Sequence, residues 1–179
     1  YQAGLLLDPD LQYNIIKSKY NLANNLYLIK QYNEALEVIL GCYKTAPYYD
    51  KVNFLSLLGN IYVSFKDNTK AKEYFKLSIK ELKDNTSNIQ DSTNLAGLYI
   101  NFSLFLISAN EFIEAGKNLN SATVLMNFDT KGLDVSNLYY TYGELYSKRP
   151  FGTNSFDGFK KSKIDNLNIA LNYYQKAII

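Results

Sequence analysis

Residues 22–47 of the chain read LANNLYLIKQYNEALEVILGCYKTAP. Small and large residues follow one another here in a fixed order: Ala23 stands beside Leu22 and before Leu26, and Ala35 follows Tyr32. The helix-like spacing of the apolar residues predicts helices rather than strands. A proline ends the stretch, as expected just beyond a helix. We therefore predict two helices joined by a short turn.

The same order of small and large residues returns three more times along the chain. Two helices joined by a tight turn approach closely only where no large side chain stands between them, which explains the small residues. One helix pair cannot bury its apolar face alone, so neighbouring pairs are expected to stack. The later copies are Leu58, Gly59, Tyr62, Ala71, Phe75 and Ser78; Phe102, Ser103, Leu106, Phe112, Ala115, Leu119 and Ala122; and Tyr142, Gly143, Tyr146, Leu167, Ala170, Tyr174 and Ala177.

This recurring order resembles the tetratricopeptide repeat, as found in bacterial regulatory and sensory proteins. The resemblance implies an all-α fold, a right-handed superhelical solenoid of antiparallel helix pairs with about four repeats and a partial N-terminal helix. The intervals between the small residues exceed the roughly 34 residues typical of this repeat, which predicts longer helices or extended loops. The alternative is an ordinary helical bundle, which supplies apolar periodicity but no recurring order of small and large residues.

We expect one solenoid domain over residues 1–179. Pro9 follows a short apolar run, and we interpret residues 1–9 as the end of a preceding repeat that the proline terminates. No polar capping helix follows the last repeat, which favours a segment of a larger protein. The predicted repeats are 14–47, 50–82, 95–126 and 135–179, the last with a loop insertion at about 148–165.

Composition limits the classes of partner. The chain has 179 residues, 47% of them hydrophobic and 20% charged, as in ordinary globular domains. A net charge of +2 is too small to indicate a nucleic-acid partner. The most apolar run, residues 98–107, is too short to span a bilayer, so we expect no membrane insertion. The compartment stays open, with the cytoplasm slightly favoured over the periplasm.

Absent residue types argue against catalysis. The chain has no histidine and a single cysteine, which excludes the usual nucleophile triads and the usual zinc sites. Its glycines are too scattered for a phosphate-binding loop. The carboxylate pairs Glu111 with Glu114 and Asp8 with Asp10 fall near predicted helix ends or turns, where acids are usually solvated. We predict a protein that is not an enzyme and binds neither cofactor nor metal, with Cys42 as a structural thiol.

The resemblance implies that the first helix of each repeat lines a concave groove. Asn24 and Asn60 fall at equivalent places in two neighbouring repeats, and their amides can donate and accept hydrogen bonds with an extended peptide backbone. Tyr20 stands where family members that hold acidic chaperone tails carry a lysine, which disfavours that class. The alternative is that these asparagines are simply solvated. The predicted groove residues are Tyr20, Asn24, Tyr27, Asn53, Asn60, Asn101, Tyr140 and Glu144.

The insertion in the last repeat is the one idiosyncratic segment. It combines basic residues with three phenylalanines, so we expect it to pack on the solenoid or to contact a partner. Contact with single-stranded nucleic acid is a less favoured alternative, because no wider basic stripe accompanies it. The predicted contact residues are Arg149, Phe151, Phe156 and Phe159.

These observations favour a non-enzymatic scaffold or adaptor that binds another protein, or an extended peptide, through the groove. The alternative is a peptide- or small-ligand-sensing receptor domain of a bacterial transcriptional regulator. The two differ in that a receptor needs a deep groove, whereas a scaffold uses a broad surface. The ends of a solenoid also offer surfaces for a homo-oligomer.

Overall fold

A computed structural model of the chain describes residues 8–44, 46–85, 89–126, 133–150 and 163–178. These residues are helical apart from short turns and ends, and they include no strand, which confirms the all-α prediction. The helices in this part of the chain are α1 (Pro9–Leu28), α2 (Tyr32–Leu40), α3 (Tyr48–Ser64), α4 (Asn68–Asn85), α5 (Ile89–Ser108), α6 (Phe112–Leu125), α7 (Leu133–Lys148) and α8 (Lys163–Ala177).

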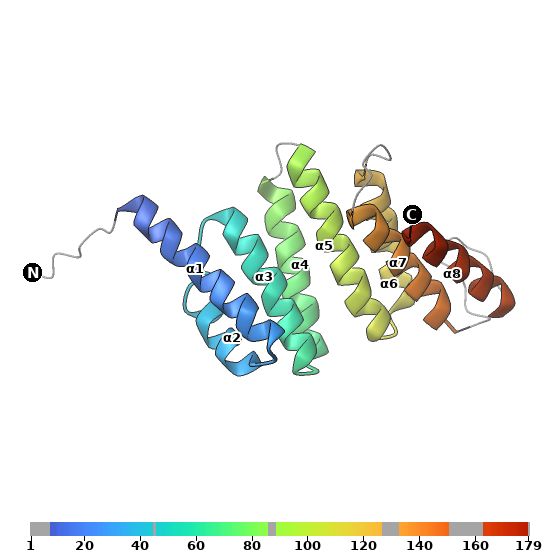
Figure 1. The fold of residues 1–179 in the computed structure, drawn as a ribbon, viewed down its shortest axis with the longest axis horizontal. Helices are drawn as coiled ribbons and strands as arrows, with labels where there is room; N and C mark the ends of the chain where they lie inside the picture. The colour runs from blue at the N-terminus through green and yellow to red at the C-terminus, as the bar shows by residue number, and fades with distance from the viewer. Residues whose placement is uncertain (1–7, 45, 86–88, 127–132, 151–162, 179) are drawn as a thin grey trace, which may run out of the picture. The chain divides into compact units, whose positions relative to one another are not determined.

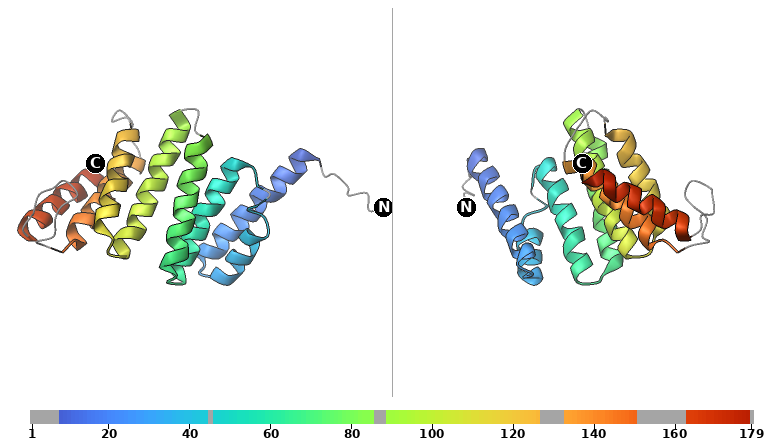
Figure 2. Two further views of the ribbon diagram at one scale, coloured as in Figure 1. Left: turned by 180° about the vertical axis from the view of Figure 1, so that it is seen from behind. Right: turned by 45° about the vertical axis from the view of Figure 1, so that its right-hand side comes forward.

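The helices divide between two units, Tyr1–Asn85 and Thr86–Ile179. In the first unit α1 packs on α2 and α3 packs on α4, and α3 also contacts both α1 and α2 (Figures 1 and 2). In the second unit α5 packs on α6 and α7 on α8, and α7 contacts both α5 and α6. Each unit therefore consists of two antiparallel helix pairs, joined by the first helix of the second pair. One continuous solenoid over both units remains a prediction.

The small residues permit the close contact within the pairs. A Cβ added to Gly59 would lie 3.0 Å from the Phe75 ring of α4, and one added to Gly143 would lie 2.5 Å from the Tyr174 ring of α8. Ser103 uses its small side chain differently, because its Oγ donates a hydrogen bond to the Ala115 carbonyl of α6 at 3.2 Å. The recurring order in the sequence thus marks the places where paired helices meet.

Three of the turns share one backbone conformation. Lys30, Lys66 and Asn110 adopt left-handed φ values of 66°, 60° and 63°, each seven residues after the small residue of its repeat. In each turn the amide of the following residue donates back to the first helix, for example from Asp67 to the Tyr62 carbonyl at 3.0 Å. A residue in this conformation lets the last turn of a helix close upon itself before the chain reverses.

Pro9 begins α1, and the predicted end of a preceding repeat at residues 1–9 stays a prediction. Asp8 caps α1, its side chain accepting a hydrogen bond from the Asp10 amide at 3.0 Å, and Pro9 occupies the first helical position. Proline fits that position because its missing N–H would have no helical partner there. Residues 1–7 lie outside the described part of the chain.

Helix lengths explain the long intervals between repeats. Helices α1 and α5 have 20 residues each and α4 has 18, and α1 and α5 begin before residues 14 and 95, where the predicted repeats start. Helix α7 ends at Lys148 and α8 begins at Lys163, within the predicted insertion at 148–165.

Cys42 belongs to the apolar core of the first unit. It is 3% exposed, and its Sγ donates to the Val38 carbonyl at 3.1 Å. Burial raises the pKa of the thiol, and the charge of Lys19 only partly opposes this effect. The thiol is therefore neutral at neutral pH, as a structural role requires.

Leu22 departs from the expected inner face of its helix, because it is 51% exposed. Its counterparts in the later repeats are buried, so this exposure is a property of the first helix alone. None of the described helices combines the length with the apolar character that crossing a membrane would need.

Candidate functional site

Five of the predicted groove residues come together in the first unit, on α1 and α3. These two helices contact each other, and the Tyr20 ring of α1 lies against the Phe54 ring of α3 with 5.4 Å between centroids. Asn53 is exposed, whereas Asn24 and Asn60 are half-buried. These five residues thus lie on two helices that contact each other, and their role in binding stays a prediction. We call this surface the amide face; it comprises Tyr20, Asn24, Tyr27, Asn53 and Asn60.

The amides of Asn24 and Asn60 are equivalent polar groups of this surface. Each asparagine directly follows the small residue of its repeat, so the two occupy the same place on adjacent, touching helices. Within the described part of the chain, neither side chain forms a hydrogen bond. Each amide offers two donor hydrogens and one acceptor oxygen. A ligand placed here could use both.

The tyrosines of the amide face are anchored in the core of the unit. Tyr20 and Tyr27 are half-buried and pack against the apolar core of the unit, Tyr27 against the Tyr32 ring with 5.7 Å between centroids. Burial raises the pKa of the Tyr20 hydroxyl, so it is neutral at neutral pH. Both rings are held in place before any ligand arrives, which limits the ordering entropy that binding would cost.

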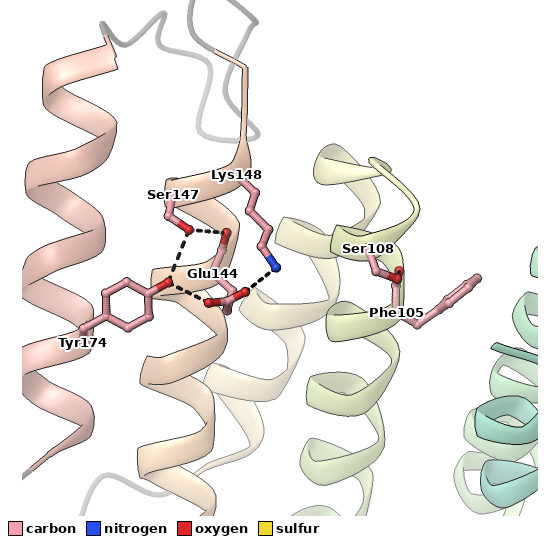
Figure 3. Close-up of polar contacts among 6 residues, drawn as sticks. All are labelled: Phe105, Ser108, Glu144, Ser147, Lys148 and Tyr174. Carbon is pink, nitrogen blue, oxygen red and sulfur yellow. Dashed lines mark hydrogen bonds and ion pairs between the residues drawn. The ribbon is translucent and has the colours of Figure 1, made fainter. Parts of the chain in front are cut away.

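The second unit arranges its predicted residues differently. Glu144 follows the small Gly143 of α7, as Asn24 and Asn60 follow theirs, but its carboxylate is already engaged (Figure 3). Its Oε1 accepts a hydrogen bond from the Tyr174 hydroxyl at 2.8 Å, and its Oε2 lies 2.6 Å from the Lys148 ammonium. Ser147 Oγ lies 3.3 Å from the same Tyr174 hydroxyl. The carboxylate therefore ties α7 to α8.

Opposing effects set the pKa of the Glu144 carboxyl. Burial alone would raise this pKa. The hydrogen bonds from Lys148 and Tyr174, the charge of Lys148 and a hydrogen bond from Tyr140 outweigh burial and lower it. Glu144 is thus ionised at neutral pH and satisfied within the protein, which makes it a positioning group rather than an open ligand-binding group.

Asn101 and Tyr140 do not complete an amide pair in this unit. Asn101 is exposed but lies two residues before Ser103, so it faces another side of its helix than Asn24 does of α1. The true counterpart of Asn24 in α5 is Leu104. Tyr140 is 48% exposed, and its ring lies 5.9 Å from that of Tyr174. The paired amides are therefore confined to the first unit.

Arg149 is buried, at 7% exposure, directly after α7. With the start of α6 it borders an open cavity of about 550 Å³. This cavity could not be predicted from the sequence, because its walls come from segments separated by all of α7. Phe151, Phe156 and Phe159 lie outside the described residues. The lining residues are Asn110, Glu111, Phe112, Ile113, Glu114, Lys117 and Arg149.

The partners of Glu144 were missed by reasoning from the sequence. The contact with Lys148 could have been predicted, because a glutamate four residues before a lysine on a helix commonly forms an ion pair. The contact with Tyr174 could not, because Tyr174 lies 30 residues away from Glu144, beyond the insertion. Among the described residues no three potential metal-ligating side chains cluster.

Comparison with known proteins gives no assignment: no protein-family model matches the chain, and no curated protein is significantly similar to it.

Proposed function

We propose that the chain is a tetratricopeptide-type interaction module that binds an extended segment of a partner polypeptide through the amide face. The recurring small residues support the repeat assignment, since Gly59 and Gly143 occupy equivalent places and each faces an aromatic ring of the paired helix. The packing order within the units supports it too, because the first helix of the second pair contacts both helices of the first pair in each unit.

The available amides of Asn24 and Asn60 carry the functional part of this proposal. An extended peptide presents backbone N–H and C=O groups at regular intervals, and two equivalent amides on adjacent helices can bind successive ones. The rigid rings of Tyr20 and Tyr27 would cover its side chains. Because the amide face offers no carboxylate, we expect selection through backbone shape and apolar contacts rather than through charge.

The second unit makes a useful contrast. Its residues at the same places are Leu104 and Glu144, of which the first cannot hydrogen-bond and the second is bound to Tyr174 and Lys148. We therefore assign peptide recognition to the first unit.

A peptide-display selection against the folded chain tests this function. Selected peptides would be measured by fluorescence anisotropy against the parent chain and the double variant Asn24→Ala/Asn60→Ala. Loss of two hydrogen bonds worth about 1 kcal/mol each should weaken binding roughly 30-fold. The matched control is Asn25→Ala/Asn33→Ala, which removes two exposed amides from the same unit and should leave affinity unchanged. Equal binding by both double variants would contradict the assignment.

A further inference from the structure

An unpartnered apolar stripe runs along α1. Leu22 is 51% exposed, whereas its counterparts Leu58, Phe102 and Tyr142 are 0%, 2% and 7% exposed. Leu11 and Ile15 continue the exposed stripe toward the start of the helix. We call these residues, Leu11, Ile15 and Leu22, the head face. The counterparts of the stripe are covered by other helices, whereas no helix in the described part of the chain covers the head face.

A second stripe runs along α8 and onto the residue after it. Leu167, Leu171 and Ile178 are all exposed, and their spacing puts them on one side of the helix. We call these residues the tail face. Asn166 and Ala170, on the side that packs against α7, are buried instead.

The second unit shows what covers a residue in the place of Leu22. The Tyr142 hydroxyl of α7 lies 3.1 Å from the Thr123 hydroxyl of α6. Tyr142 immediately precedes its small residue, as Leu22 does. Thr123 lies eight residues after Ala115, as Ile178 lies eight residues after Ala170. If a second copy packed in the same register as α7 packs on α6, Ile178 of one copy would cover Leu22 of the other.

The first unit gives an independent second pair. The Tyr32 ring of α2 lies 6.2 Å from the Phe65 ring at the end of α3. Counted from the small residue of each helix, Tyr32 corresponds to Leu167 and Phe65 corresponds to Ile29. Ile29 is 65% exposed. Both members of this second predicted pair are apolar and exposed.

A hollow on α1 supplies a third match. Ser18 helps to line an open hollow of about 380 Å³ beside Ile15 and Leu22. The counterpart of Ser18 in α3 is Phe54, which packs against Tyr20. The counterpart of Tyr20 in α7 is the exposed Tyr140. In the same packing between two copies, the Tyr140 ring of one copy would fill the hollow beside Ser18 of the other.

We propose that copies of this chain join head to tail, with the head face of one copy packed on α7 and the tail face of the next, as α3 packs on α1 and α2. The proposal rests on the repeat register and is independent of peptide binding. Because the two faces differ, the contact is heterologous, and it adds copies without closing into a two-fold dimer.

Sedimentation velocity of the purified chain over a wide concentration range tests the proposal. The weight-average mass should rise with concentration. Leu22→Glu blocks the head face and Leu171→Glu blocks the tail face, and both sites are exposed enough for the fold to survive. Each variant alone should be monomeric. An equimolar mixture should form a one-to-one dimer, because the open tail face of Leu22→Glu can bind the open head face of Leu171→Glu. Nothing larger should form, because the other two faces of the dimer are blocked.

Val124→Glu is the matched control, since Val124 is an exposed apolar residue of α6 outside both faces, and it should associate like the parent. Circular dichroism checks folding, and Leu11→Lys with Leu167→Lys provides a second pair of blocked variants. A parent chain that stays monomeric at every concentration would overturn the proposal. So would folded blocked variants that fail to pair on mixing, or that still self-associate singly, which would indicate a contact between like faces.

Discussion

Tyr174 of α8 lies so close to Gly143 of α7 that a Cβ on the glycine would come within 2.5 Å of the tyrosine ring. The ring cannot simply move aside, because its hydroxyl donates to Glu144 at 2.8 Å and lies 3.3 Å from Ser147 Oγ. One glycine thus sets the separation of two helices, and the hydrogen bonds of one tyrosine fix their register.

Gly143→Ala should destabilise the chain by about 1–3 kcal/mol, because over-packing forces the helices apart or the ring out of its hydrogen bonds. Gly97→Ala is the control, since no atom lies within 4 Å of a Cβ added there. Alanine at that site should stabilise α5 by about 1 kcal/mol through helix propensity alone. Urea unfolding followed by circular dichroism measures both. Equal stabilisation by the two changes would contradict the close approach.

Lys66→Gly should stabilise the chain by about 0.5–1 kcal/mol, because Lys66 has a left-handed φ of 60° that glycine adopts without strain. Lys80→Gly, at an exposed site inside α4, should instead cost about 1 kcal/mol. Thermal unfolding of the two variants gives opposite shifts of Tm if the turn has this conformation. A lower Tm for both would show that the turn is not left-handed.

Ser78→Ala should cost about 1–2 kcal/mol. Ser78 is fully buried in α4, and its Oγ donates to the Val52 carbonyl of α3 at 2.9 Å. Removing the hydroxyl deprives a buried carbonyl of a donor. Ser121→Ala, which removes an exposed hydroxyl from α6, should have little effect on chemical denaturation. An equally small loss of unfolding free energy in both variants would contradict a stabilising hydrogen bond between α3 and α4.

Acid should weaken the link between α7 and α8. The folded-state pKa of Glu144 is lowered from its ordinary 4.5, so the ionised carboxylate stabilises the fold above that pH. This contribution is lost as the pH falls below 4.5 through the lowered pKa. Glu144→Gln should therefore cost about 1 kcal/mol at neutral pH and less in acid. Glu37→Gln, at an exposed site in α2, controls for the loss of charge. A stability difference between parent and Glu144→Gln that does not shrink in acid would exclude this role.

The sequence predicted the helix pairs because their determinants are local. Gly59 and Gly143 were identified from the order of small and large residues, and both face aromatic rings in the structure. The amides of Asn24 and Asn60 were found in the same way, since a repeat puts equivalent positions on neighbouring helices.

Features that depend on distant partners could not be predicted. Glu144 was expected in an open groove, but Tyr174 reaches it across the insertion, and no local pattern announces that contact. Leu22 stands where the other repeats have a core residue, but it is 51% exposed because no helix in the described part of the chain covers it.

The most direct test of peptide recognition is an NMR titration of the ¹⁵N-labelled chain with a selected peptide, following the side-chain amide resonances. We predict that the resonances of Asn24 and Asn60 shift together and saturate, while those of Asn25 and Asn33 stay in place. Saturable shifts that spare Asn24 and Asn60 and appear elsewhere would contradict the assignment of the amide face.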